Sequence, residues 1–381
     1  METEVPDVTR RAVLQLLAAA GLWRHWPALA AADARRWLGG YRDADGEFGL
    51  AGVDGDGLIR ARTPLPGRMH AAVAHPDGRR WVALARRPGS FAAVLDSQDG
   101  AVVSRFETAP GRHFQGHGAF SADGEWFYST ENDFEGERGV IGVRAVGEGH
   151  RRRLEWPSHG IGPHELLLAP DGRSLLVANG GILTHPATGR SKLNLPTMQP
   201  SLVRLDAGSG ELLDALELEP ALHTLSIRHI AATPDGAVVF GMQNQGAPDL
   251  EAPLVGVWRG GERVSFLAAD RPLWRGYIGS VAVDPGAGLA AASAPRDGCV
   301  LFWRLADGAP AGVLALADGC GVAPGERAGA FLVSSGEGTL LRVVVDAAGV
   351  RVLSRVRLDL AWDNHLIAVN PLPAMARSAG R

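Results

Sequence analysis

Several residue types that would mark a large protein class are scarce in this sequence. Only two of its 381 residues are cysteine, Cys299 and Cys320, which excludes a disulfide-rich scaffold and a zinc site built from four cysteines. A net charge of −4 gives no excess of basic residues for binding nucleic acid. The sequence also lacks a phosphate-binding loop, a serine-hydrolase elbow and the H-E-x-x-H zinc motif. Composition and simple motifs therefore name no activity.

Glycine is abundant instead, at 50 residues, against a usual share of ~7%. The glycines follow no collagen-like period, so they indicate many tight turns. Hydrophobic residues make up 46% of the chain, which is enough for a substantial core.

The N-terminus has the pattern of a twin-arginine export signal. Arg10 and Arg11 precede an apolar run from Ala12 to Trp23 that is too short to span a membrane comfortably. Arg24 follows, and Ala28–Ala30 fits a cleavage site of the A-x-A kind. The alternative is an amphipathic N-terminal helix. The export reading places the mature protein in the periplasm and outside the membrane.

These features predict four segments. They are a signal peptide over 1–30, a linker over 31–45, one folded domain over 46–371 and a flexible tail over 372–381.

The folded domain is an internal repeat. Each of four units begins with a histidine and a short apolar strand, continues with an Asp-Gly turn, and enters a second apolar strand. Asp-Gly between apolar runs is a strong signal for a hairpin. Weaker units begin near Gly279 or Ser280 and at Cys320. The full set of starts is His70, His117, His164, His229, Ser280, Cys320 and His365.

The starts lie about 40–65 residues apart, with room for four strands in each unit, so the sequence predicts an all-β protein, a seven-bladed β-propeller. Six or eight blades stay open as alternatives. The last start leaves one strand before the C-terminus. We expect strands near Phe48–Val53 and Leu58–Arg62 to complete that blade and close the ring. Residues 182–199 form an insertion in the third unit.

The first strand of a propeller blade lines the central channel, so the residues that open the units should meet at one channel mouth. The candidate metal ligands are His70, His117, His164, His229, His365 and Cys320. Imidazole and thiolate suit Cu, Fe or Zn better than Mg or Ca. The other channel-mouth candidates are Glu165, Arg228, Asp363 and Asn364, as ligands, as hydrogen-bond partners of ligands or as anion contacts.

The alternative is architectural, because a strand-start histidine can join neighbouring blades, and a ring can be too wide for one ion. His70 fits a ligand least well, since Met69 and Ala71 give it no polar companion in the sequence. Cys299 and Cys320 could form a disulfide, but their positions in the repeat favour two thiols.

A run of motifs resembles a family of twin-arginine-exported bacterial propeller proteins of unknown function. The matching stretches are Gly116–Gly118, Gly139–Val143, Gly160–Leu166, Asn179–Ile182, Thr184–Pro186, Lys192–Leu195, Leu225–His229, Tyr277–Val281 and Trp362–Leu366, within residues 68–370. Members of that family tend to be encoded beside imelysin-like and di-haem peroxidase-like periplasmic proteins. The resemblance implies a place in iron uptake and supplies no catalytic residues.

Three functions follow as hypotheses. The first is a non-catalytic periplasmic accessory protein, monomeric, that binds a transition metal and has a protein partner in an iron-uptake system. The second is an enzyme, either an oxidoreductase or a lactonase-like hydrolase that uses Glu165 and a metal-bound water. The third is an interaction scaffold that presents residues 182–199 to a partner.

Overall fold

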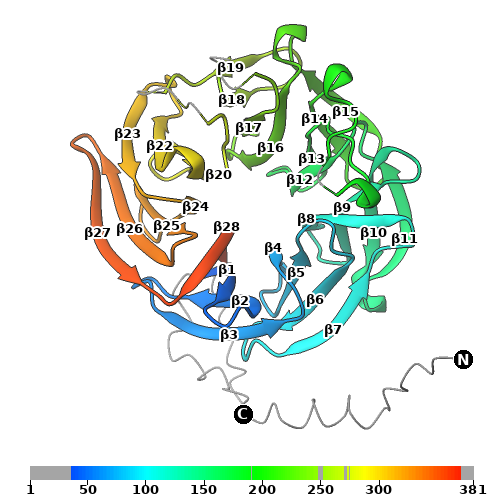
Figure 1. The fold of residues 1–381 in the computed structure, drawn as a ribbon, viewed down its shortest axis with the longest axis horizontal. Helices are drawn as coiled ribbons and strands as arrows, with labels where there is room; N and C mark the ends of the chain where they lie inside the picture. The colour runs from blue at the N-terminus through cyan, green and yellow to red at the C-terminus, as the bar shows by residue number, and fades with distance from the viewer. Residues whose placement is uncertain (1–35, 190, 248–251, 270–272, 274, 370–381) are drawn as a thin grey trace, which may run out of the picture.

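A computed structural model describes residues 36–369 except 190, 248–251, 270–272 and 274. In this part of the chain seven four-stranded antiparallel sheets surround a central channel, as Figure 1 shows. The predicted seven-bladed β-propeller is confirmed.

The sheets are named here as blades 1 to 7. Blade 1 contains β4 (Met69–Ala74), β5 (Arg80–Ala85), β6 (Phe91–Asp96) and β7 (Val102–Glu107). Blades 2 and 3 contain β8 (Arg112–Phe120), β9 (Trp126–Asp133), β10 (Arg138–Ala145) and β11 (Arg151–Pro157), then β12 (Pro163–Leu168), β13 (Ser174–Asn179), β14 (Ser201–Asp206) and β15 (Leu212–Glu217). Blades 4 and 5 contain β16 (Leu225–Ala232), β17 (Val238–Asn244), β18 (Val255–Trp258) and β19 (Val264–Phe266), then β20 (Ser280–Asp284), β21 (Leu289–Ala294), β22 (Cys299–Arg304) and β23 (Pro310–Ala315). Blade 6 contains β24 (Gly319–Pro324), β25 (Ala330–Ser335), β26 (Thr339–Asp346) and β27 (Gly349–Arg357).

Blade 7 joins the two ends of the chain. Its inner strand is β28 (Leu360–Val369), and the other three are β1 (Arg36–Asp43), β2 (Phe48–Val53) and β3 (Ile59–Leu65). Pairing of β1 with β28 closes the ring, as expected. The predicted linker over 31–45 needs correction, because residues 36–43 form β1. The sequence suggested only two N-terminal strands for this blade, and the structure has three.

Within the described ranges, five short 3-10 helices lie in the connections between strands. They are η1 (Val146–Glu148), η2 (Pro186–Thr188), η3 (Leu195–Thr197), η4 (Pro220–Leu222) and η5 (Pro295–Asp297). Both η2 and η3 fall in the predicted insertion over 182–199, which connects β13 to β14.

The Asp-Gly turns form where the sequence predicts them. Gly78, Gly124, Gly172 and Gly236 all have positive φ, which glycine adopts without strain, and each turn joins a first strand to a second strand. The inner three strands of each blade carry mostly apolar residues because both faces are covered by neighbouring blades. Outer strands such as β7 alternate between exposed residues and residues that are partly or fully buried.

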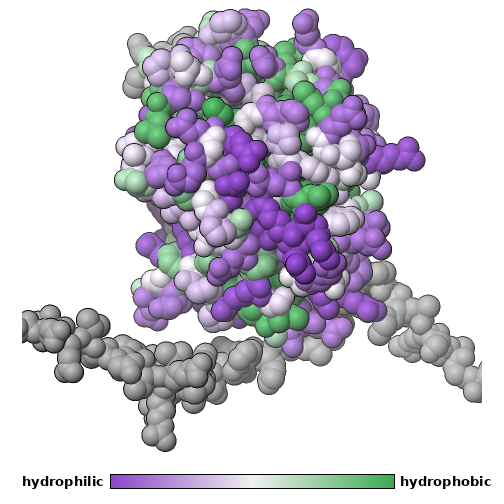
Figure 2. Space-filling view, turned by 90° about the vertical axis from the view of Figure 1, so that its right-hand side faces the viewer, coloured by the Kyte–Doolittle hydropathy of each residue, from purple (hydrophilic) through white to green (hydrophobic). Residues whose placement is uncertain are grey.

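The hydrophobic core lies between adjacent blades. Between blades 2 and 3, for example, Tyr128 and Ile141 pack in one cluster with Leu166, Val177 and Val203. On the outside of the ring, Figure 2 shows mostly hydrophilic side chains with small hydrophobic areas among them. In the described residues, no helix has the length and apolar character needed to cross a bilayer.

Candidate metal centre in the central channel

Backbone irregularities place the candidate ligands. Six of the seven inner strands have a break in the register of their pairing with the second strand. In each of the six, the break lies at or beside the predicted ligand, which is a histidine or Cys320. The exception is β20, where Ser280 pairs regularly with Ser293. A β-bulge turns a side chain away from the regular alternation. His70 and His164 are themselves the extra residues, whereas in β16 the extra residue is Arg228, beside His229.

Gly116 makes room for one of these side chains. Its φ is +107°, and a Cβ built on it would lie 2.6 Å from both Cβ and Cδ2 of His70. Only glycine fits both the backbone angle and this close approach. The Gly116–His117 pair in β8 therefore accepts the neighbouring blade's histidine while it supplies its own.

The five predicted histidines converge. Ring centroids of His70 and His117 are 4.7 Å apart, and those of His70 and His365 are also 4.7 Å apart. On the other side of the cluster, His229 lies 4.7 Å from His164 and 4.7 Å from His365. His117 lies 4.8 Å from His365 and 5.3 Å from His164. The channel is therefore narrow enough at this level for imidazoles from five blades to meet.

Two groups of three histidines could hold a metal ion. They are His70, His117 and His365, and His117, His164 and His229; within each group the ligand atoms all lie within 4.8 Å of one another. His117 belongs to both groups. His70, which looked like the poorest ligand in the sequence, is part of the first group.

Each of the five rings has a buried nitrogen without a hydrogen-bond partner among the described residues. The atoms are Nδ1 of His70 and His164 and Nε2 of His117, His229 and His365. A buried polar atom left unsatisfied costs about 1–3 kcal/mol, so such atoms are rare and call for an explanation. A cation held by one of the two groups of three histidines could accept lone pairs from the nitrogens of that group.

The opposite ring nitrogens of three histidines have polar neighbours. Nδ1 of His229 lies 3.1 Å from one carboxylate oxygen of Glu165, and Nδ1 of His117 lies 3.5 Å from the other. Nδ1 of His365 is 3.5 Å from the Ser280 hydroxyl. The Ile230 amide donates to Glu165 at 3.2 Å and fixes the carboxylate. Metal-binding histidines are held in this way, with one nitrogen on a protein acceptor and the other toward the ion.

The histidines are neutral at ordinary pH. Burial lowers the pKa of His70, His117, His164 and His229 well below the usual value, and nearby positive groups lower it further. Burial likewise lowers the pKa of His365 to about 3. Neutral imidazole is the form that binds metal, so these rings need lose no proton before they bind an ion.

Burial has the opposite effect on the carboxyl group of Glu165 and raises its pKa to about 7. The carboxyl group lies between the Nδ1 atoms of His117 and His229.

Cys320 lies outside this cluster. It is absent from both groups of ligands, and its Sγ is 3.2 Å from the Asp363 carbonyl oxygen and 3.7 Å from the Ser334 hydroxyl. Burial raises the pKa of the thiol to about 12, so the thiolate that a metal needs is disfavoured. The prediction of Cys320 as a ligand is therefore not supported by its surroundings. Cys299 is also buried, and the two cysteines form no disulfide, as the sequence favoured.

The remaining candidates line the mouth of the channel. Asp363 is buried and pairs with Arg86 at 2.7 Å and with Arg68. Its Oδ1 is 3.9 Å from Nδ1 of His70. Asn364 donates to the Tyr277 hydroxyl at 2.7 Å. The sequence analysis missed Arg68 and Arg86, although both stand at strand ends on the side where the inner strands begin.

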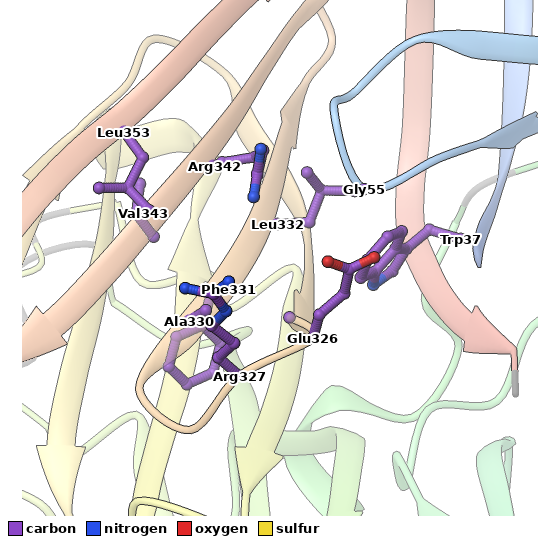
Figure 3. Close-up of a pocket in the computed structure, with 11 residues that line it drawn as sticks. Trp37, Gly55, Glu326, Arg327, Ala330, Phe331, Leu332, Arg342, Val343 and Leu353 are labelled. Atoms are coloured by element: carbon purple, nitrogen blue, oxygen red, sulfur yellow. The ribbon is translucent and has the colours of Figure 1, made fainter. Parts of the chain in front are cut away.

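A separate cavity of about 150 Å³ lies between blades 6 and 7, and Figure 3 shows Trp37, Glu326 and Arg342 around it. Glu326 follows the end of β24, whereas Cys320 is near its beginning, so Glu326 lies toward the face of the propeller opposite to the histidine mouth. It contains no histidine.

Comparison with known proteins assigns a family and a fold. Residues 63–369 match the family described as "Protein of unknown function (DUF1513)". The chain belongs to this family. No curated protein matches it.

Solved propellers of similar shape include "Kuenenia stuttgartiensis Hydrazine Synthase", with a TM-score of 0.59 and 15% identity over 82% of this chain and 93% of that one. Another is "Structure of U3-55K", with a TM-score of 0.59 and 12% identity over 81% of this chain and 89% of that one. At these identities the similarity shows the fold alone.

Proposed function

We propose that this DUF1513 protein is a metal-binding propeller whose five channel histidines hold a transition-metal ion. The observation that carries the proposal is the convergence of five imidazole rings, each with a buried and unpartnered nitrogen, into two groups of three that could hold an ion. Their neutral state and the carboxylate of Glu165 behind two of them support it. An architectural role explains the burial of the rings, but gives no partner to the five nitrogens.

The donor set indicates which ions fit. Imidazole nitrogen suits Cu, Zn, Fe and Ni, and no thiolate from Cys320 joins the cluster. By the usual order of affinities, Cu²⁺ should bind more tightly than Zn²⁺ or Fe²⁺. We propose a non-catalytic role, because the oxygens of Glu165 face His117, His229 and the Ile230 amide rather than standing apart as a base.

We further propose that the protein acts after export to the periplasm and works with a protein partner in iron uptake. The support for export is the Arg10-Arg11 pattern, which lies outside the described residues. The support for iron is the family resemblance. Both are independent of the geometry in the channel, so binding of copper or zinc alone would sustain the metal site and leave the link to iron without support.

Metal analysis of the purified full-length chain tests the proposal. After equilibrium dialysis against Cu²⁺, Zn²⁺ or Fe²⁺, we expect at least one equivalent of one ion in the wild type. We expect its loss in a variant that combines His117→Ala, His164→Ala and His229→Ala. His223→Ala is the control, because this ring binds the Pro220 carbonyl away from the cluster. Equal metal content in all three folded proteins would contradict the proposal.

A further inference from the structure

Several basic side chains lie near one another at the mouth above the histidines. Arg86 and Arg228 are half-buried there, and Arg296 and Lys192 are exposed. The guanidinium carbon of Arg296 lies 4.9 Å from the centre of the Tyr277 ring. Since Asn364 donates to the Tyr277 hydroxyl and Arg86 lies 3.4 Å from the Asn364 oxygen, Tyr277 and Asn364 connect Arg296 to Arg86.

Arg228 belongs to the same group. It directly precedes His229, and Tyr277 pairs with Gln243, which stands opposite Ser226. Burial lowers the pKa of Arg228 to about 10, Tyr277 acts against this, and Arg86 and Arg296 add to it by repulsion. Burial lowers the pKa of Lys192, and repulsion from nearby Arg228 and Arg296 lowers it further.

The described carboxylates nearest to Arg228 and Arg296 form no ion pair with either of them. Asp363 is already shared by Arg68 and Arg86. Asp297 accepts from the Arg275 amide through Oδ1, its buried Oδ2 has no hydrogen-bond partner among the described residues, and Glu165 lies deeper, against the histidines. Among the described residues, no carboxylate lies within ion-pair distance of Arg228 or Arg296, and the polar contact of Arg228 is with the Ser226 hydroxyl, at 3.4 Å.

Basic side chains without a carboxylate partner attract anions. Guanidinium groups are suited to carboxylate and phosphate oxygens, which they bind through two parallel hydrogen bonds. A half-buried arginine without a carboxylate partner, directly beside a metal-binding histidine, is well placed for an anion that also touches the ion.

We propose that the channel mouth binds a small oxyanion, of the carboxylate or phosphate class, between Arg228, Arg296 and Tyr277, and that this anion and the metal ion strengthen each other's binding. This inference rests on the proposed metal site. The coupling is reciprocal: an anion that raises the affinity for the metal by some factor has its own affinity raised by the same factor.

Calorimetric titration with inorganic phosphate and with acetate, at constant ionic strength, tests the inference on metal-free and metal-loaded protein. The variants are Arg228→Gln and Arg296→Gln, the second of which removes an exposed side chain and so protects the test against misfolding. Arg263→Gln is the matched control, because it removes the same charge from an exposed turn between β18 and β19, at the end of the channel opposite to the mouth.

We expect phosphate or acetate to bind the wild type, at least tenfold more tightly when metal is present. We expect Arg228→Gln or Arg296→Gln to raise the dissociation constant tenfold or more, with metal content unchanged, and Arg263→Gln to change it less than twofold. Equal anion affinity in all four proteins would overturn the inference, as would anion binding that ignores the metal.

Failure of the metal site itself would be visible separately. If no ion binds to the wild type, the proposed function fails and the coupling with it. The titration of metal-free protein then still decides the anion site: a tenfold effect of Arg228→Gln retains it, and no effect removes it.

Discussion

Substitution of Gly116 by alanine tests how the histidine cluster is assembled. Gly116 has a φ of +107°. A Cβ atom added to it would lie only 2.6 Å from Cβ and Cδ2 of His70. Gly116→Ala therefore brings two costs. A residue with a side chain is strained in this backbone conformation by about 1–3 kcal/mol. Overpacking against His70 adds about 1–3 kcal/mol.

The two costs do not simply add, because movement of His70 would relieve part of both. We therefore expect Gly116→Ala to lower the free energy of unfolding by about 3 kcal/mol in total. Urea denaturation followed by tryptophan fluorescence and circular dichroism would measure it. Displacement of His70 should also weaken metal binding, since His70 belongs to one of the two groups of ligands.

Gly236→Ala is the matched control for this prediction. Gly236 also has a positive φ, +87°, but nothing lies within 4 Å of the place for its Cβ. It should cost only the backbone strain and leave metal binding unchanged. If both alanine variants lost the same stability and kept the same metal affinity, the claim that Gly116 leaves space for the His70 side chain would be refuted.

Three further predictions concern single residues. Glu165→Gln should weaken metal binding about 10- to 100-fold in dialysis while the protein stays folded, because the group behind two ligands orients them; unchanged affinity would contradict this. Cys320→Ser should leave metal content unchanged, and the wild-type thiol should resist thiol reagents at pH 8 until the protein unfolds, because its pKa is raised to about 12. Burial lowers the pKa of His150 to about 4, so this ring stabilises the fold above pH 6.5 and the benefit disappears as the pH falls toward 4. Relative to His150→Asn, which tolerates the positive φ of this position, wild-type protein should lose roughly 3 kcal/mol between pH 7 and pH 4, and parallel stability curves would speak against it.

The architecture could be predicted from local signals. Asp-Gly turns such as Asp77-Gly78 and Asp171-Gly172 fix hairpins through the positive φ of glycine, and the repeat of such hairpins defines the blades. Four inner strands, β4, β12, β20 and β24, begin within one residue of the predicted starts, whereas β8, β16 and β28 begin four or five residues before the histidine that was expected to open them. These features depend on residues close together in the chain, which a sequence shows directly.

Features that depend on distant residues could not be predicted in the same way. Strand β1 pairs with β28 at the other end of the chain, so its segment looked like a linker. His70 has its polar neighbour, Asp363, near the C-terminus and therefore seemed isolated. The convergence of the rings depends on channel width, which the blade count and the bulges set together.

Cys320 shows the limit of reasoning from repeat position. It occupies the ring position of blade 6, and β24 also has a shifted register there. The side chain nevertheless contacts the backbone of Trp362 and Asp363 in β28 rather than the histidines. Position in a repeat predicts which residues lie near the channel, but the local register of each strand decides where a side chain points.

Anomalous diffraction at the absorption edge of the loaded metal tests the central claim most directly. Crystals of the full-length protein, loaded with one equivalent of Cu²⁺ or Zn²⁺, should give an anomalous peak between the imidazoles of His117 and its neighbours, with no sulfur ligand. A peak elsewhere on the protein, or an empty cluster in crystals that contain the metal, would contradict the account.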